Sequence, residues 1–457
     1  MRRLSAPDAA MYWRSAMLPS DQFVVYCFDA PHEQVDLVSV MAGLRERSCG
    51  INDLRLRILP VPGDLDRPYW VRADVDHAAF AVHRPATWGE CLTMIAELID
   101  DQLDPAESAW RVHLFGPIAD APCGDGGGDG PAVVAVVQVS HALADGRGTA
   151  AICRALFGTG GREVTDPAGD VAGWTGAVRW IRTMRWMLAA AGVVRLPVSV
   201  GSMIWFGMRS FIEYRRAATE QIATPTRAPQ PAGVLNRHPG SRRSLRVIVL
   251  PRPSLSADHS VTVVALTAIS FALDELLGPA PRRAIELTVG TPPRAGQRNN
   301  FRNAAIELHP ESTGAGERMA RIAEEVAVAR RFVADPDPVA VAARRAESAT
   351  PAFLAHWGVR QLEADTPPST VTGVTVVSSV NRGPADLMLA GGAVRFTAGF
   401  PALSPAQGLT HGVHGIGLTV AISVTTSPEI VDVDSYIAML RRGLDRVTGD
   451  GEGRAAR

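Results

Sequence analysis

Short apolar runs alternate with amphipathic stretches along the first 175 residues of the chain. Nearly uninterrupted apolar runs at 22–28 and 133–139 predict two buried strands. Apolar residues at helical spacing predict helices over 88–102 and 149–156. A further helix is expected over 33–46 and a further strand over 111–115. Strands that alternate with helices in this way are typical of α/β domains.

A segment rich in Pro, Thr, Arg and Gly at 224–240 predicts a linker, after which a second series of elements begins. The patterns predict strands at 246–250, 284–289, 303–308, 371–378 and 417–423, and helices at 261–277, 316–333 and 434–447. Because 457 residues exceed what one hydrophobic core usually organises, we expect two α/β lobes of similar size. The expected division is a first lobe over 1–175, a crossover and linker over 176–240, a second lobe over 241–448, and a disordered tail over 449–457.

The segment 174–214 differs from both halves because it combines Trp, Met, Val and Leu with interspersed arginines. It fits an amphipathic surface that lies in a lipid interface, with apolar groups inward and guanidinium groups on anionic headgroups. It also fits a crossover element buried between two domains. A membrane-spanning helix over 187–208 is disfavoured by Arg195 and Pro197 near its middle.

Composition indicates a folded protein and disfavours binding of nucleic acid or a metal centre. Hydrophobic residues make up 46% of the chain and charged residues 20%, and the net charge of −1 gives no long-range attraction to nucleic acid. The five cysteines are scattered and lack metal-ligand spacing, which favours a reducing cytoplasm over a metal centre. No apolar core of signal-peptide length occurs near the N-terminus, so we expect a cytoplasmic protein.

The candidate chemistry follows the predicted strand at 133–139. His141 leaves the end of this strand, Asp145 comes four residues later, and Gly146 precedes the next predicted helix. An imidazole can remove a hydroxyl proton, a carboxylate can fix the local loop, and glycine allows the chain to turn sharply. The same pattern also fits a purely structural histidine.

Several short motifs together resemble the bacterial wax ester synthase/diacylglycerol acyltransferase family. This family belongs to the wider superfamily of acyl-CoA-dependent acyltransferases and peptide-synthetase condensation domains. The matching elements, in chain order, are the opening stretch 3–10, Leu103-Asp104, Trp110, Leu114, His141 with Asp145 and Gly146, Leu235-Asn236 with Arg242-Arg243, the stretch 291–294, Asn299 and the stretch 378–384.

The resemblance implies a fold of two similar-sized mixed-sheet lobes, similar to chloramphenicol acetyltransferase and to condensation domains, with a tunnel between them. It implies that an acyl-CoA donor meets a lipid alcohol, either diacylglycerol or a long-chain alcohol, and that His141 acts as general base. Asp145 is expected to form an ion pair with Arg294. Arg147 is the alternative partner for this carboxylate. Candidate tunnel or oxyanion residues are Gly146, Asn299, Ser378 and Asn381, although turn and strand-end hydrogen bonding would also explain the last three. Acyl-CoA is a substrate, and neither a cofactor nor a metal is expected.

The chain departs from the family pattern at several positions. Ser140 stands where the family has the first histidine of its motif, and Arg298 stands where it has a glycine. About Thr262-Val263 replaces an Asn-Asp pair. A catalytically degenerate or repurposed acyl-binding protein therefore stays open, as does an acyltransferase that uses carrier-protein thioesters. Interaction with a membrane or lipid-droplet surface through 174–214 would place the protein on the inner face of the membrane.

Two further histidines, His411 and His414, lie in the sequence Thr-His-Gly-Val-His-Gly. Such a pair could suggest a metal site, but no third ligand follows at useful spacing. We therefore expect a Gly-rich loop at this position.

Overall fold

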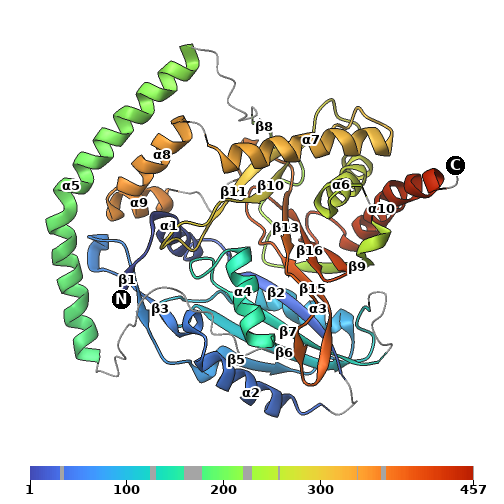
Figure 1. Cartoon of the computed structure of the whole chain (residues 1–457), viewed down its shortest axis with the longest axis horizontal. Helices are drawn as coiled ribbons and strands as arrows, with labels where there is room; N and C mark the ends of the chain where they lie inside the picture. Colours follow the sequence, from blue (N-terminus) through green and yellow to red (C-terminus); the bar gives the residue numbers. More distant parts are fainter. Residues whose placement is uncertain are drawn as a thin grey trace.

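A computed structural model of the chain describes residues 1–30, 35–123, 130–158, 178–219, 229–255, 258–336, 338–361 and 367–455. Two sheets form its centre (Figure 1), and each of them contains six strands. The first sheet has the order β14-β15-β2-β7-β6-β5. Its strands are β2 (Gln22–Asp29), β5 (Phe80–His83), β6 (Trp110–Ile118), β7 (Ala132–Val139), β14 (Met388–Leu389) and β15 (Gly392–Phe400).

The second sheet has the order β11-β10-β13-β16-β17-β9. Its strands are β9 (Ser244–Pro251), β10 (Ala284–Gly290), β11 (Phe301–Glu307), β13 (Val376–Asn381), β16 (Leu409–Ile416) and β17 (Thr419–Thr426). Two smaller sheets contain β1 (Arg2–Arg3), β4 (Tyr69–Arg72) and β3 (Leu56–Leu59), and β12 (Thr370–Val371) with β8 (Gln230–Pro231). Both large sheets mix parallel with antiparallel pairs, because β5 is parallel to β6 and β13 is parallel to β10 and β16.

The strands of the first sheet are buried on both faces. Successive side chains of β2 point to opposite sides, so Tyr26 and Phe28 contribute to one hydrophobic core and Val25 and Cys27 to another. The first core is closed by α1 (Ala6–Ser15), α2 (Leu37–Cys49) and α4 (Gly146–Phe157), and the second by α3 (Trp88–Leu98). The second core also contains Leu245 of β9, so it joins the two sheets. Burial on both faces explains why apolar runs, without alternation, marked these strands.

The outer face of the second sheet is covered by α6 (Val261–Leu277), α7 (Ala315–Ala334) and α10 (Val433–Ala455). The predicted helix over 261–277 is confirmed at both ends, and Ser260 caps it by accepting from the backbone N–H of Val263. α10 extends to Ala455, into the segment over which a disordered tail was predicted.

The hairpin formed by β14 and β15 comes from the second half of the sequence but lies in the first sheet. β15 pairs antiparallel with β2, bringing Phe396 opposite Cys27 and Phe400 opposite Phe23. The expected second lobe over 241–448 therefore contributes a hairpin to the first sheet.

The Gly-rich loop expected around His411 and His414 is wrong, because these residues lie within β16. Gly412 is required there: a Cβ atom would lie 2.2 Å from the carbonyl oxygen of Gly399 on β15. The glycines therefore allow two strands to approach closely. His411 is buried and its Nε2 lies 2.7 Å from the hydroxyl of Tyr436, whereas His414 is buried at the register position opposite Val380.

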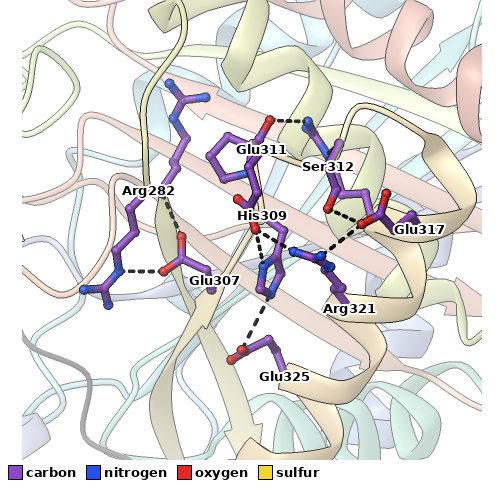
Figure 2. Close-up of polar contacts among 11 residues, drawn as sticks. Arg282, Glu307, His309, Glu311, Ser312, Glu317, Arg321 and Glu325 are labelled. Carbon is purple, nitrogen blue, oxygen red and sulfur yellow. Dashed lines mark hydrogen bonds and ion pairs between the residues drawn. The ribbon is translucent and has the colours of Figure 1, made fainter.

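The turn between β11 and α7 is held by a network of charged residues, shown in Figure 2. His309, at a φ of 50°, places its Nδ1 3.0 Å from Glu311 and its Nε2 3.6 Å from Glu325. Arg321 of α7 binds the same Glu311 at 2.8 Å and Glu317 at 3.0 Å. These contacts fix the angle at which the chain enters α7.

The segment after α4 contains one continuous helix, α5 (Val178–Thr219), of 42 residues. It runs along one side of the molecule, beside α8 (Pro338–Ala349) and near α9 (Ala352–Arg360), in Figure 1. At about 1.5 Å per residue it is about 63 Å long. Over 183–216 only Ala189 and Gly192 are buried, so the expectation of an element buried between two domains is wrong.

Candidate active site

His141 lies directly beyond the end of β7, in a loop that leads into α4. It is partly buried, and the ring of Phe301 lies beside its own at a centroid distance of 5.5 Å. Asp145 caps α4, since its Oδ1 accepts the backbone N–H groups of Arg147 at 3.1 Å and Gly148 at 2.9 Å. The strand end and the helix cap therefore fix the two ends of the short loop that carries the histidine.

Three consecutive residues that precede β11 hold this loop from the other lobe. Arg298 donates from Nη1 to the carbonyl oxygen of Leu143 at 3.1 Å. Asn299 donates from Nδ2 to the carbonyl oxygen of His141 at 2.7 Å. The backbone N–H of Asn300 donates to Asp145 Oδ2 at 2.9 Å. The candidate site is therefore assembled at the contact between the two halves of the chain.

The amide of Asn299 determines which nitrogen of His141 is protonated. Its Nδ2 donates to two acceptors, the carbonyl oxygen of His141 and Oδ1 of Asp8, so its Oδ1 must be the atom that faces His141 Nδ1 at 3.3 Å. An oxygen acceptor there favours a proton on Nδ1. The lone pair of the neutral imidazole is then on Nε2, which is the arrangement that a general base requires.

Burial lowers the pKa of His141 below its ordinary value. The hydrogen bond with Asn299 and the charge of Asp145 act in the opposite direction and raise it, but burial has the larger effect. The imidazole is therefore neutral at pH 7 and able to accept a proton.

Asp8 of α1 is a site residue that sequence reasoning missed. It is fully buried, and its carboxylate accepts the backbone N–H groups of Arg298 at 3.1 Å and Asn299 at 3.0 Å as well as the side-chain amide of Asn299 at 3.0 Å. Ser5 donates its hydroxyl to the same carboxylate at 2.5 Å. The only sequence signal was the resemblance of the stretch 3–10 to the family's opening motif, which gave no partner for Asp8.

The expected ion pair between Asp145 and Arg294 is wrong. Both carboxylate oxygens of Asp145 are occupied by backbone N–H groups, and the Arg294 side chain is exposed. The competitor Arg147 directs its guanidinium to the carbonyl oxygens of Thr291 and Asn300 instead. Asp145 is therefore held by backbone N–H groups. A pattern of charged residues in the sequence cannot reveal such partners.

Replacing Asp145 with asparagine is expected to destabilise the fold rather than to change the chemistry. Either orientation of the new amide places an NH₂ group against a backbone N–H, so a buried donor loses its acceptor. We expect the free energy of unfolding to fall by about 1–3 kcal/mol, with a lower soluble yield. Denaturant unfolding measures this change, with the exposed Asp445→Asn on α10 as control. An unchanged unfolding midpoint would contradict the structural role of Asp145.

Two departures from the family pattern have clear structural roles. Ser140 is fully buried, and its Oγ accepts the backbone N–H of Ala142 at 3.3 Å. Arg298, in place of a glycine, binds Asp53 at 2.7 Å and lies over the ring of Trp70 at 5.3 Å. Both residues therefore shape the loops around His141.

The other candidate residues differ in what they contact. Asn299 uses both amide hydrogens on Asp8 and His141, so its side chain cannot also donate to an oxyanion. Gly146 lies in the first turn of α4, where a Cβ would be 3.1 Å from Val380, so close packing explains this glycine better than a sharp turn. Asn381 accepts the N–H of Gly383 at 3.0 Å within an exposed turn. Ser378 is partly buried on β13, and its side chain makes no hydrogen bond with the residues that the structure describes.

No group of three or more His, Cys, Asp or Glu side chains arranged to hold a metal occurs in the part of the chain that the structure describes. The five cysteines are all free thiols, of which Cys27, Cys91 and Cys153 are buried.

Comparison of the whole structure with solved structures gives matches over nearly the full chain. The wax ester synthase/diacylglycerol acyltransferase from Marinobacter aquaeolei VT8 matches with a TM-score of 0.64 and 16% sequence identity, covering 98% of this chain and 99% of that one. A mutant starter condensation domain of rhizomide synthetase, in complex with C8-CoA and Leu-SNAC, matches with a TM-score of 0.54 and 13% identity, covering 98% and 93%. A second mutant of that domain, in complex with C8-CoA, gives a TM-score of 0.52 and 14% identity, covering 97% and 93%.

No protein-family model and no curated protein matches the sequence. The structural likenesses show the fold, which is that of wax ester synthase/diacylglycerol acyltransferase and of condensation domains. The expected α/β fold with mixed sheets in two lobes is therefore confirmed.

Proposed function

We propose that the protein is an acyl-CoA-dependent O-acyltransferase that esterifies a lipid alcohol, with His141 as general base. The observation that carries this proposal is the orientation of the imidazole. Oδ1 of Asn299 accepts the proton on Nδ1 of His141, which leaves the lone pair of the imidazole on Nε2. The fold, which is shared with an acyltransferase and with condensation domains crystallised with C8-CoA, is consistent with the same chemistry.

In the proposed reaction, Nε2 of His141 removes the proton of the acceptor hydroxyl as its oxygen attacks the thioester carbonyl. The tetrahedral intermediate then collapses, the carbon–sulfur bond breaks, and the coenzyme A thiolate leaves with the proton that the imidazolium returns. A positioned base contributes roughly 10²–10⁴-fold in rate. Holding both substrates in place contributes up to about 7–11 kcal/mol. The leaving thiolate is stable, so the reaction requires neither a cofactor nor a metal. Ser378 and the side-chain NH₂ group of Asn381 remain as side-chain candidates for stabilising the oxyanion.

Release of coenzyme A from acyl-CoA, measured with a panel of alcohols that includes diacylglycerols and long-chain alcohols, tests this function. Release that depends on the alcohol is the expected result. Binding of acyl-CoA without release would instead support a repurposed acyl-binding protein. Turnover restricted to acyl-phosphopantetheine proteins would support an acyltransferase that uses carrier-protein thioesters.

The rate of acyl transfer should stay high at neutral pH and fall only below about pH 6.5. Because burial lowers the pKa of His141, the neutral form that accepts a proton persists to lower pH than it would for an exposed histidine. The pH dependence of kcat/KM reports this pKa for the free enzyme. An acidic limb with a midpoint above pH 7 would be inconsistent with His141 as the base.

We also propose that α5 lies against a membrane or lipid-droplet surface, from the cytoplasmic side. Among the described residues α5 contains the one helix segment, Thr183–Arg216, that is long and apolar enough to cross a membrane, and only 11% of its most apolar window is buried. Exposed apolar side chains recur along α5 at helical spacing, at Met187, Val194, Val198, Trp205, Met208 and Ile212.

The contacts of Arg195 favour a helix that lies in the interface over one that spans the bilayer. Arg195 Nη1 binds Oδ2 of the buried Asp66 at 2.8 Å and the hydroxyl of Tyr69 at 3.0 Å, and Arg185 binds the carbonyl oxygen of Pro60 at 3.0 Å. These bonds hold the first half of α5 against the protein body. The apolar stripe then faces outward, as a helix in a lipid interface requires.

Replacing Trp205 with aspartate is expected to weaken binding to lipid vesicles by about tenfold or more, because burying a large apolar side chain contributes about 1.5–3 kcal/mol. Co-sedimentation with vesicles that contain anionic lipid measures the change. Leu418→Asp is the matched control, since Leu418 is equally apolar and 72% exposed but lies at the turn between β16 and β17. Equal binding of both variants would argue against α5 as the membrane surface.

A further inference from the structure

An arginine-lined cavity of about 620 Å³ lies between α5, α8 and the N-terminal strand β1. Its volume is within the range of pockets that bind small molecules. None of the described residues that line it is acidic. Five of them are arginines: Arg3, Arg67, Arg294, Arg344 and Arg345. The cavity therefore concentrates positive charge in a protein whose net charge is −1.

Three of the five arginines that line the cavity form no direct pair with a carboxylate among the described residues. The guanidinium groups of Arg67, Arg294 and Arg345 make no hydrogen bond or ion pair with any residue that the structure describes. Arg3 pairs with Asp66, but the same carboxylate also binds Arg195 of α5 at 2.8 Å. One acidic group thus serves both Arg3 and Arg195.

Two of the arginines that line the cavity have unsatisfied donors. The Nε atoms of Arg3 and Arg67 are buried and have no hydrogen-bond partner among the described residues. Burial and the neighbouring charge of Arg3 lower the pKa of Arg67 to about 10. Like charges repel one another, and an anion bound beside Arg3 and Arg67 would reduce this repulsion.

We propose that this cavity binds a phosphate-bearing group. Guanidinium groups bind phosphate through paired hydrogen bonds and charge, and several of them converge here. The chain contains no lysine, so the use of arginine rather than lysine at these positions carries no information. The proposal rests on the clustering of positive charge.

The position of the cavity indicates two sources for the phosphate. Arg294 lies in the same loop as Asn299, which orients His141, so a phosphate of coenzyme A is one candidate for the group bound there. Val198 and Phe206 of α5 line the same cavity, so the headgroup of a phospholipid could enter from the proposed lipid surface. The first source rests on the proposed acyl-CoA chemistry, and the second does not.

Binding of inorganic pyrophosphate to the full chain, measured by isothermal titration calorimetry, tests the site without requiring turnover. Arg294→Gln and Arg345→Gln are each expected to weaken binding by about tenfold, because a hydrogen bond to a charged group is lost. Arg330→Gln, at an exposed position on α7, is the matched control and should leave the affinity unchanged. Absence of pyrophosphate binding, or an equal loss in all three variants, would overturn the proposal.

The same variants distinguish the two sources. Tighter binding of coenzyme A than of coenzyme A lacking its 3′-phosphate, lost in Arg345→Gln, would assign the site to the acyl donor. Binding to phosphatidylglycerol vesicles but not to phosphatidylcholine vesicles, lost in the same variant, would assign it to a lipid headgroup. If neither ligand depends on the cavity arginines, the proposal is wrong. An inactive enzyme that still binds pyrophosphate through these arginines would contradict the proposed function and leave this site standing.

Discussion

Replacing His141 with alanine is expected to lower the rate of coenzyme A release by about 10²–10⁴-fold or more, which is the contribution of a positioned general base. The loss should appear in kcat. The base removes the proton of the acceptor hydroxyl during the chemical step, and it does not contribute to binding of the acyl-CoA. Release of the free thiol from acyl-CoA, followed in the presence of a saturating alcohol, measures it directly.

His77→Ala provides the control for this substitution, since His77 is an exposed histidine in the short 3-10 helix before β5. Its turnover should equal that of the unmodified protein. The unfolding midpoint of the His141→Ala protein must also stay close to that of the parent, so that loss of activity reports chemistry. A folded His141→Ala protein with full turnover would refute the assignment of His141 as the base.

Asp8→Ala is expected to have the second large effect, on stability and activity together. The substitution leaves three buried donors without their acceptor: the backbone N–H groups of Arg298 and Asn299 and the side-chain amide of Asn299. At about 1–3 kcal/mol for each unsatisfied group, the free energy of unfolding should fall by about 3 kcal/mol or more. The amide of Asn299 would then be free to rotate, and His141 would lose the group that orients it.

Asp8 acts on the reaction through Asn299, so its role must be separated from a loss of folding. In the folded fraction of Asp8→Ala, kcat should fall more than KM changes, because substrate contacts are not removed. Asp445→Ala on the exposed face of α10 controls for removal of an acidic residue. A variant that loses stability but keeps the parental kcat would show that Asp8 is only structural.

Sequence reasoning succeeded where one local cause determines the structure. The central strands β2 and β7 are apolar along their whole length because both faces are buried, and α6 begins at its Ser260 cap. The prediction failed at β16. The residues around Gly412 and the buried His411 suggest a loop by their composition, although they lie in a strand that packs closely against β15. Composition alone does not distinguish a glycine that permits a turn from one that admits a neighbouring strand.

The candidate site was predicted in part for a similar reason. His141 and Asp145 are local to one motif, and the motif identified them. Their partners come from distant parts of the chain, since Asp8 and Asn299 are separated by 291 residues. The wrong assignment of Arg294 had a different origin: charge complementarity suggested an arginine, whereas three backbone N–H groups already satisfy the Asp145 carboxylate.

The hairpin of β14 and β15 has a consequence for how the protein is made. During synthesis, β2 is complete long before β15, the neighbour that pairs with it, leaves the ribosome. At about 5–20 residues per second, the delay between residues 29 and 400 is on the order of 20–70 s. For that time the apolar edge of β2 is unpaired and able to pair with other chains. The first sheet therefore stays incomplete until the β14–β15 hairpin has been synthesised, and the nascent chain is expected to need chaperone protection until then.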